Sequence, residues 1–304
     1  MENKQQHLHF YSVLGLVVIG FSWGFGFVAL DWCERIPAFM IMAIRFFMAA
    51  ALLAVIFWKH LKYIDKELLK SGVIIGLFMF LCYACAGFGI RFTTTSRTAF
   101  FSCLGAICVP MLNFFFFKIK MTRKAIFCVV VCLIGVYSIS MGGSMDLGFN
   151  FGDMLCLLAS IFGASQVIAV ERLGKHHDIF ALSTVELFTI TVLSVLMSLI
   201  TGEKYPGNIT PLEIGSLLFI GVICSALCFV LQMASQKHVP ANRVGLILTL
   251  EPVVGAVASV LLLGDVLGLF GIVGGVLIVA SIIISETSTG SESQGEAEEQ
   301  ILLK

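Results

Sequence analysis

Long apolar runs, separated by short polar connectors, recur along the whole chain. Each run is about 20 residues long, which is what an α-helix needs to cross the ~30 Å hydrocarbon core of a bilayer at ~1.5 Å per residue. The runs are continuous rather than alternating, which favours helices over the strands of a barrel. The pattern predicts ten helices, at residues 10–30, 37–58, 71–91, 95–117, 124–143, 153–170, 179–201, 212–236, 241–263 and 266–285.

Composition agrees with this pattern. Hydrophobic residues make up 59% of the chain, charged residues only 12%, and the mean hydropathy is +1.01. Soluble domains carry about 25% charged residues, so a chain this apolar belongs in a lipid bilayer. The run at 10–30 is longer than the apolar core of a signal peptide and no Ala-x-Ala site follows it. We therefore expect an all-α integral membrane protein whose surroundings are lipid rather than nucleic acid.

The basic residues predict the orientation of the helices. With a cytoplasmic N-terminus, 14 of the 19 lysines and arginines would lie on the inner side, four would lie outside, and Arg45 would lie within a helix. Such a bias is typical of cytoplasmic loops. We expect a multi-pass protein of the cytoplasmic membrane with both termini in the cytoplasm.

The stretch Gly245–Ala256 holds a charge beside a weak point of a helix. Glu251 falls near the middle of the run at 241–263, where a charged side chain costs roughly 2.5–3.5 kcal/mol and should face protein or water. Pro252 removes one helical hydrogen bond and clashes with the carbonyl of Leu248. Two interpretations stay open: a transport pathway, or a structural carboxyl in a merely kinked helix.

Seven further polar or aromatic side chains fall inside predicted helices. Trp23 lies away from the interfacial belts that tryptophan favours, and either lines a cavity or packs. Arg45 lies ~12 Å into its helix, which favours pairing with another helix over substrate contact. The other five would either bind substrate or stabilise the bundle, through contacts between helices or through pairing of charges within the membrane. They are Tyr83, Asn113, Gln166, Glu186 and Gln232.

Residue spacing predicts three helix faces. Gly20 and Gly24 are four residues apart, so another helix can approach them closely. A buried or wet stripe is expected at Cys224, Cys228, Gln232 and Gln236, and a glycine ridge at Gly264, Gly268, Gly271 and Gly275.

The two halves of the chain repeat weakly. Aligning Pro110 with Pro252 gives each half a helix, a tight polar turn and a proline-interrupted helix. Five helices precede the linker at 142–148 and five follow it, so the halves have opposite orientations. Inverted repeats with helices broken at corresponding positions indicate a secondary transporter. We expect repeats at 10–143 and 150–285, helix breaks or gates at Pro110 and Pro252, and a disordered cytoplasmic tail at 286–304.

Three motifs resemble those of the EamA-type family of the drug/metabolite transporter superfamily. They are Trp23-Gly24-x-x-Phe27, Leu250-Glu251-Pro252-Val253 and Leu263-Gly264-Asp265-Val266-Leu267. The resemblance covers roughly residues 10–285. It implies inverted five-helix halves around a central cavity and movement of small metabolites, often amino-acid export.

The chain departs from the family pattern at two places. Asp265 stands where the family commonly has Glu. In the first half, Val109 stands where the second half has Glu251, and Lys118-Ile119-Lys120 replaces the Leu-Gly-acid pattern. Any role for acidic chemistry therefore depends on the second half.

Other chemistry finds no support in the sequence. It has no nucleotide-binding Gly-x-x-x-x-Gly-Lys-Ser/Thr loop, no His-Glu-x-x-His and no nucleophile–base pair, so we expect no catalytic residues, metal or cofactor. Cys82-x-x-Cys85 lies within an apolar run, where cysteine behaves as a small hydrophobe.

We therefore expect a secondary transporter, a monomer or homodimer, that exports amino acids or related metabolites and is either driven downhill or coupled to an ion. Glu251 would bind a proton or the substrate's amine, Arg45 and Glu186 would pair or couple, and the side chains of Trp23, Tyr83, Asn113, Gln166 and Gln232 would contact substrate. The alternatives are a multidrug exporter, a channel and a non-transporting scaffold.

Overall fold

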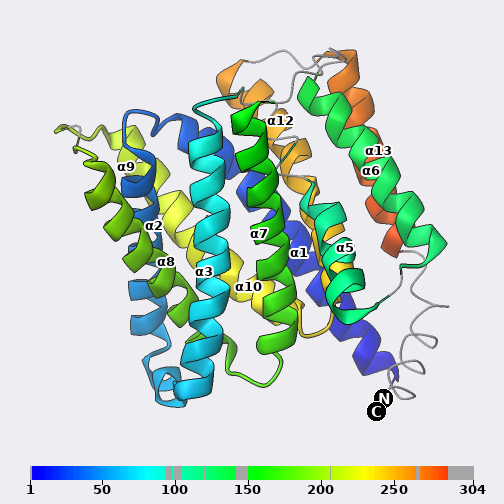
Figure 1. The fold of residues 1–304 in the computed structure, drawn as a ribbon, viewed down its shortest axis with the longest axis horizontal. Helices are drawn as coiled ribbons and strands as arrows, with labels where there is room; N and C mark the ends of the chain where they lie inside the picture. Colours follow the sequence, from blue (N-terminus) through cyan, green and yellow to red (C-terminus); the bar gives the residue numbers. More distant parts are fainter. Residues whose placement is uncertain are drawn as a thin grey trace.

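A computed structural model describes residues 2–93, 98, 101, 104–119, 121–141, 150–205, 207–264 and 268–286. Throughout these residues the protein is a bundle of helices (Figure 1), and none of them lies in a β-strand. The elements are α1 (Glu2–Asp31), α2 (Ala38–Ile56), η1 (Trp58–Tyr63), α3 (Lys66–Gly89), α5 (Gly105–Phe117), α6 (Arg123–Met141), α7 (Phe151–Leu173), α8 (Ile179–Thr201), α9 (Pro211–Leu218), η2 (Phe219–Leu227), α10 (Cys228–Ser235), α11 (Ala241–Leu248), α12 (Leu250–Leu263) and α13 (Leu269–Glu286).

Within the described residues, seven stretches of helix are long and apolar enough to cross a membrane. They are His7–Asp31, Ala38–Ile56, Lys66–Gly89, Phe151–Leu173, Ile179–Thr201, Pro211–Ser235 and Ala241–Leu263. Shorter apolar helices occupy Gly105–Phe117 and Leu269–Ser285, and α6 adds 19 residues. The expectation of an all-α membrane protein is confirmed for the described part of the chain. The predicted linker at 142–148, Asp265 and the predicted tail from 287 onward lie outside the described residues.

The outer surface of the bundle is apolar. Large hydrophobic side chains that are more than half exposed occur on helices from both halves; they include Phe115, Leu199, Ile200, Leu261 and Leu269. In water such a surface would drive association, whereas lipid tails solvate it. The interior instead holds buried polar residues, including Arg45, Gln166 and Glu186.

Side-chain caps set the helix starts that the hydropathy pattern misplaced. Asp65 accepts a hydrogen bond from the Leu68 amide at 2.7 Å, so α3 begins at Lys66 rather than at residue 71. Asn150 and Asp153 cap each other's backbone, so α7 begins at Phe151 rather than 153. These caps satisfy amide groups that have no partner within the first turn.

The N-terminus of α2 is capped from the other half of the chain. Pro37 at the cap position supplies no side-chain hydrogen bond. Instead, Glu203, beyond the end of α8, accepts the backbone amides of Phe39 at 3.2 Å and Met40 at 2.8 Å. A carboxylate at a helix N-terminus is favourable because the helix dipole is positive there.

Helices from opposite halves of the sequence pack against each other. The main pairs are α3 with α7, α6 with α13, α2 with α8, and α1 with α12. Figure 1 shows the α6–α13 pair at one edge of the bundle and α2, α8 and α9 at the opposite edge. A further tie crosses the halves at Arg35, whose guanidinium contacts the Glu213 carboxylate at 2.9 Å.

Glycine allows the close approach of α1 to α12. A β-carbon at Gly24 would lie 2.6 Å from Cβ of Val254, and one at Gly20 would lie 3.1 Å from Cβ of Leu250. The close-approach prediction for α1 is therefore confirmed. The ridge prediction is wrong at Gly264, which ends α12 with φ +78°, and at Gly268, which has no atom within 4 Å of an added β-carbon.

Two of the membrane-length stretches are irregular near their middle. The stretch Pro211–Ser235 contains a π-helical segment, η2, and Ala241–Leu263 is interrupted at Thr249 between α11 and α12. Pro252 lies in the first turn of α12, where its missing amide costs little. In the first half, α5 continues through Pro110.

Candidate binding centres inside the bundle

Trp23 anchors α1 to the irregular helix η2. Its indole Nε1 donates a hydrogen bond to the carbonyl oxygen of Cys224 at 2.8 Å. The Cys224 thiol donates in return to the carbonyl of Ser22 at 3.1 Å. Trp23 also packs against Phe229, with ring centroids 6.2 Å apart, and stays half-buried. The side chain therefore combines helix packing with a polar anchor deep in the membrane region.

Arg45 projects from α2 into the bundle and is almost fully buried. Its Nε donates a hydrogen bond to the Ser225 hydroxyl at 3.1 Å. The guanidinium carbon lies 4.5 Å from the ring centroid of Phe46 and 5.2 Å from that of Tyr83. Cation–π contacts of this kind stabilise a desolvated charge. Ser225 is held in turn, because its hydroxyl donates to the carbonyl of Ile220, five residues earlier in the π-helical segment, at 2.8 Å.

Glu251 begins the first turn of α12 and faces the same region. Its carboxyl interacts electrostatically with Arg45 and lies near Cys82, Tyr83, Cys224 and Cys228. The side chain is surrounded by protein yet only half-buried, as expected of a group that borders internal space. We call Trp23, Arg45, Tyr83, Ser225 and Glu251 the central cluster. It places one cation and one anion together in the interior.

The break at Thr249 is stabilised by the threonine itself. The Thr249 amide donates to the carbonyl of Leu246 at 3.1 Å, and its hydroxyl donates to the same carbonyl. The hydroxyl also accepts a bond from the Cys132 thiol of α6 at 3.1 Å. Backbone irregularity in a membrane helix is tolerated where such groups re-satisfy the polar atoms. Glu251 is thus presented directly after a supported discontinuity.

A second polar cluster lies between α7, α8 and α10. Gln166 donates from Nε2 to Oε1 of Glu186 at 2.9 Å, and Gln232 donates from Nε2 to Oε1 of Gln166 at 3.0 Å. Gln232 also donates to Gln236 at 3.1 Å, and Gln236 donates to the carbonyl of Val167 at 2.8 Å. We call Gln166, Glu186, Gln232 and Gln236 the amide chain. All four are buried.

Asn113 belongs to neither cluster. Its Nδ2 donates to Oδ1 of Asn242 at 2.8 Å, which ties α5 to the start of α11. Its own Oδ1 is buried and has no hydrogen-bond partner. The structure therefore distributes the predicted binding residues over three places: Trp23, Tyr83 and Glu251 with Arg45, Gln166 and Gln232 with Glu186, and Asn113 alone.

Sequence reasoning did not single out Ser225 or Asn242. Ser225 binds Arg45, and the carbonyl of Cys224 is the acceptor for Trp23. A serine in an apolar run carries no distinctive signal, and the π-helical register leaves no pattern that hydropathy detects. The buried stripe predicted at Cys224, Cys228, Gln232 and Gln236 is confirmed, since all four side chains are buried.

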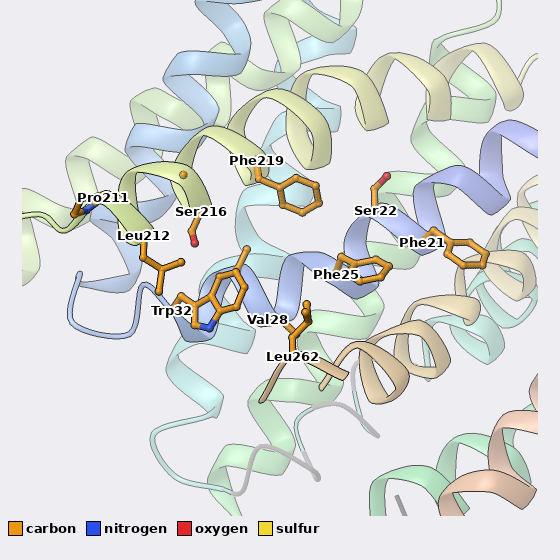
Figure 2. A pocket seen from close by; sticks show the side chains of 12 residues that line it. Phe21, Ser22, Phe25, Val28, Trp32, Pro211, Leu212, Ser216, Phe219 and Leu262 are labelled. Carbon is orange, nitrogen blue, oxygen red and sulfur yellow. The ribbon is translucent and has the colours of Figure 1, made fainter. Parts of the chain in front are cut away.

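Two hollows lie on the sides of the bundle. One, of ≈ 520 Å³, is bordered by α1, α9, η2 and the end of α12. Figure 2 shows Trp32, Leu212 and Leu262 around it, with Phe25 and Phe219 also lining it. The other, of ≈ 630 Å³, lies between α2, α3 and α8. Both linings are predominantly apolar, and neither includes Arg45 or Glu251.

The described residues offer no grouping of three His, Cys, Asp or Glu side chains that could hold a metal ion. Cys82 and Cys85 are both free thiols.

A bundle of membrane-length helices with opposite charges buried together defines an integral membrane protein of the transporter class. The chain belongs to the EamA-like transporter family, which matches it twice, over residues 10–141 and 150–287.

Similar proteins are named transporters. An uncharacterized transporter of Archaeoglobus fulgidus is 27% identical over 278 residues, covering 90% of this chain and 85% of its own. The uncharacterized transporter YoaV of Bacillus subtilis is 26% identical over 281 residues, covering 90% and 96%. A protein crystal structure matches with a TM-score of 0.77 and 14% identity, covering 90% of this chain and 96% of that one, which indicates a shared fold only.

Proposed function

We propose that this protein is a secondary transporter that exports a small zwitterionic metabolite, most favourably an amino acid, by alternating access. The observation that carries the proposal is the electrostatic interaction of Arg45 with Glu251 inside the bundle, beside a half-buried tryptophan and tyrosine. An amino acid carries a carboxylate and an ammonium group on the same α-carbon. A cation and an anion in one interior cluster match both charges, whereas a large lipophilic cation would use Glu251 alone.

The arrangement of helices supports two inverted halves of five helices each, bounded at 10–143 and 150–285. An inverted repeat relates α1 to α7 and α3 to the α9–α10 stretch, so the packing of α3 on α7 has its counterpart in α1 on α10 and η2. The pairs α2–α8 and α6–α13 would each lie across the two-fold axis. Arg45 is the eighth residue of α2 (Ala38 being the first), and Glu186 is the eighth of α8 (Ile179 being the first).

The sequence has no nucleotide-binding loop, so transport would run downhill or be coupled to an ion. The helix discontinuity at Thr249 supplies a place where α11 can move relative to α12, and Glu251 lies two residues beyond it. A bound amine or proton at Glu251 would therefore be sensed by the segment that moves. The protein would act in the cytoplasmic membrane with both termini inside, as a monomer or homodimer.

Counterflow in proteoliposomes tests the proposal. Vesicles loaded with a mixture of unlabelled amino acids should accumulate a labelled amino acid, with saturation, because a carrier exchanges substrate across the membrane. Two controls are needed: vesicles without protein, and vesicles that contain the Glu67→Gln variant. Glu67 lies in the first turn of α3. Accumulation of lipophilic cations only would favour the multidrug alternative, non-saturating ion flux would indicate a channel, and no flux with any compound would indicate a scaffold.

Glu251→Gln then assigns the role of the central carboxyl, since it keeps the size and removes the charge. Loss of substrate binding at every pH indicates direct recognition of the amine. Transport that persists without its pH dependence indicates a proton role. Wild-type transport with unchanged pH dependence in the folded variant would make Glu251 structural and would contradict the proposal.

A further inference from the structure

The amide chain contains two buried oxygen atoms that face no donor among the described residues. Glu186 receives a hydrogen bond on Oε1 from Gln166, but its Oε2 has no partner. Gln232 uses Nε2 twice as a donor, and its Oε1 has no partner either. Glu186 is 0% exposed and Gln232 is 1% exposed. Leaving a buried acceptor without a hydrogen bond is unfavourable, and more so for a charged group.

The surroundings of Glu186 supply no compensating charge. Among the described residues, its carboxyl is fully buried, accepts one hydrogen bond from Gln166 and forms no ion pair. No titratable group on the elements packed against α8 compensates the charge of the Glu186 carboxyl. These groups are Arg45 on α2, His60 and the lysines of η1, the charged residues at the start of α3, Cys82 and Tyr83 further along α3, and Cys228 on α10. Arg45 interacts with Glu251 instead. The two intramembrane carboxyls therefore lie in opposite environments.

We propose that the amide chain is a proton-binding site, in which Glu186 takes up one proton on Oε2. The proton cancels the buried charge and converts Oε2 from an unsatisfied acceptor into a donor. Oε1 of Gln232, the other unsatisfied oxygen, is a suitable acceptor for it, directly or through a water molecule. One proton shared between the two groups would satisfy both oxygens.

A metal cation fits this site less well. Hard cations take about six oxygen ligands, and the amide oxygens of Gln166 and Gln236 already accept hydrogen bonds. Two free oxygens suit a proton and are too few for sodium.

The proton site at Glu186 extends the proposed transport function. Its role in coupling protons to transport rests on that proposed function. Substrate charges are matched by the central cluster, and the proton is carried by a separate group on α8. Because Gln166 and Gln232 lie on α7 and α10, a movement of either helix relative to α8 changes the partners of the protonated carboxyl. Protonation of Glu186 therefore stabilises the conformation in which the amide chain is assembled.

Infrared difference spectroscopy of the purified chain in lipid nanodiscs tests the proton site without any substrate. A protonated carboxyl gives a C=O band separate from the carboxylate and amide bands, and this band shifts when H₂O is replaced by D₂O. We expect such a band at neutral pH in the wild type, its loss in Glu186→Gln and its retention in Glu251→Gln. Exchange of sodium for potassium should leave the band unchanged.

A second variant guards against misfolding of Glu186→Gln. Gln166→Leu removes the donor to Oε1 but keeps Glu186, so the band should move in frequency. The proposal is overturned if Glu186→Gln removes no part of the wild-type band, if Gln166→Leu leaves its frequency unaltered, or if sodium abolishes it; a remaining band that disappears only in Glu251→Gln belongs to Glu251. The infrared measurement does not depend on flux. The proton site can therefore be disproved while counterflow is observed, and it can be confirmed while no counterflow is observed.

Discussion

At the residue scale, the guanidinium of Arg45 is the most demanding group in the interior. One hydrogen bond to Ser225 and two aromatic faces stabilise it, and Glu251 supplies the opposite charge. Removing one member of a buried charge pair leaves the other uncompensated, whereas removing both does not. Arg45 and Glu251 should therefore depend on each other for stability.

A double-mutant cycle measures this dependence. Arg45→Gln and Glu251→Gln should each lower the free energy of unfolding, and the double variant should lower it by less than the sum. The coupling should be on the order of 0.5–3 kcal/mol, as for charged residues in one network. Reversible unfolding in mixed detergent micelles provides the free energies.

The matched control is the cycle of Arg45→Gln with Glu186→Gln. It should be additive within the error of the measurement, because Arg45 has no resolved effect on Glu186. If the two cycles gave equal coupling energies, the variants would be causing a general loss of packing rather than the loss of a specific interaction between Arg45 and Glu251.

Residues that are costly in a membrane could be found from the sequence. Arg45, Glu186 and Glu251 could be recognised because a charged side chain within the hydrocarbon core is energetically costly and usually has a functional or structural role. Ser225, the partner of Arg45, and Asn242, the partner of Asn113, could not be found, because single polar residues of this kind are tolerated in membrane helices. The division between the central cluster and the amide chain depends on which helices meet, and hydropathy does not encode that.

At the element scale, the approach of α1 to α12 determines where Glu251 points. Gly24 lies against Val254 and against the carbonyl oxygen of Glu251, 2.9 Å from an added β-carbon. Cβ of Val254 and the carbonyl oxygen of Glu251 move only with the backbone of α12, so rotating a side chain cannot relieve the contact. A larger residue at this position must separate the two helices.

Gly24→Ala should therefore destabilise the protein by about 1–3 kcal/mol, as overpacking of a well-packed contact does. Gly87→Ala on α3 is the matched control, since nothing lies within 4 Å of its added β-carbon and alanine favours a helix. Thermal unfolding in detergent should give a lower midpoint for Gly24→Ala only. Equal midpoints for the two variants would contradict the close-packing account.

Helix existence was predictable from sequence, whereas helix irregularity was only partly so. The break beside Pro252 was expected, but it lies at Thr249, three residues before the proline. The π-helical register of η2 was not expected, because it depends on Ser225 bonding to Ile220 and to Arg45 of another helix. The predicted glycine ridge was wrong at Gly264 and Gly268 because residue spacing alone does not reveal where a helix ends.

At the scale of the whole molecule, orientation in the membrane is the property that the distribution of basic residues predicts. A reporter fused after Lys304 and one inserted near Lys66 should both read as cytoplasmic, while one near Met145 should read as external. Fusions to a paired phosphatase and fluorescent protein distinguish the two sides. An external reading at Lys304 would contradict the inverted arrangement of the halves.

The membrane class followed from composition alone, since no soluble fold could cover so much apolar surface. The packing order of the helices did not follow, because every main pair joins segments from opposite halves of the sequence. Such contacts leave no periodic trace in either partner.

The cap on α2 has a consequence for how the chain is made. During synthesis, α2 enters the membrane long before residue 203 leaves the ribosome, so the amides of Phe39 and Met40 must first be satisfied by water or lipid headgroups. Glu203 replaces those temporary partners only after α8 has inserted. The N-terminus of α2 therefore lacks its final cap until α8, from the second half of the chain, has inserted.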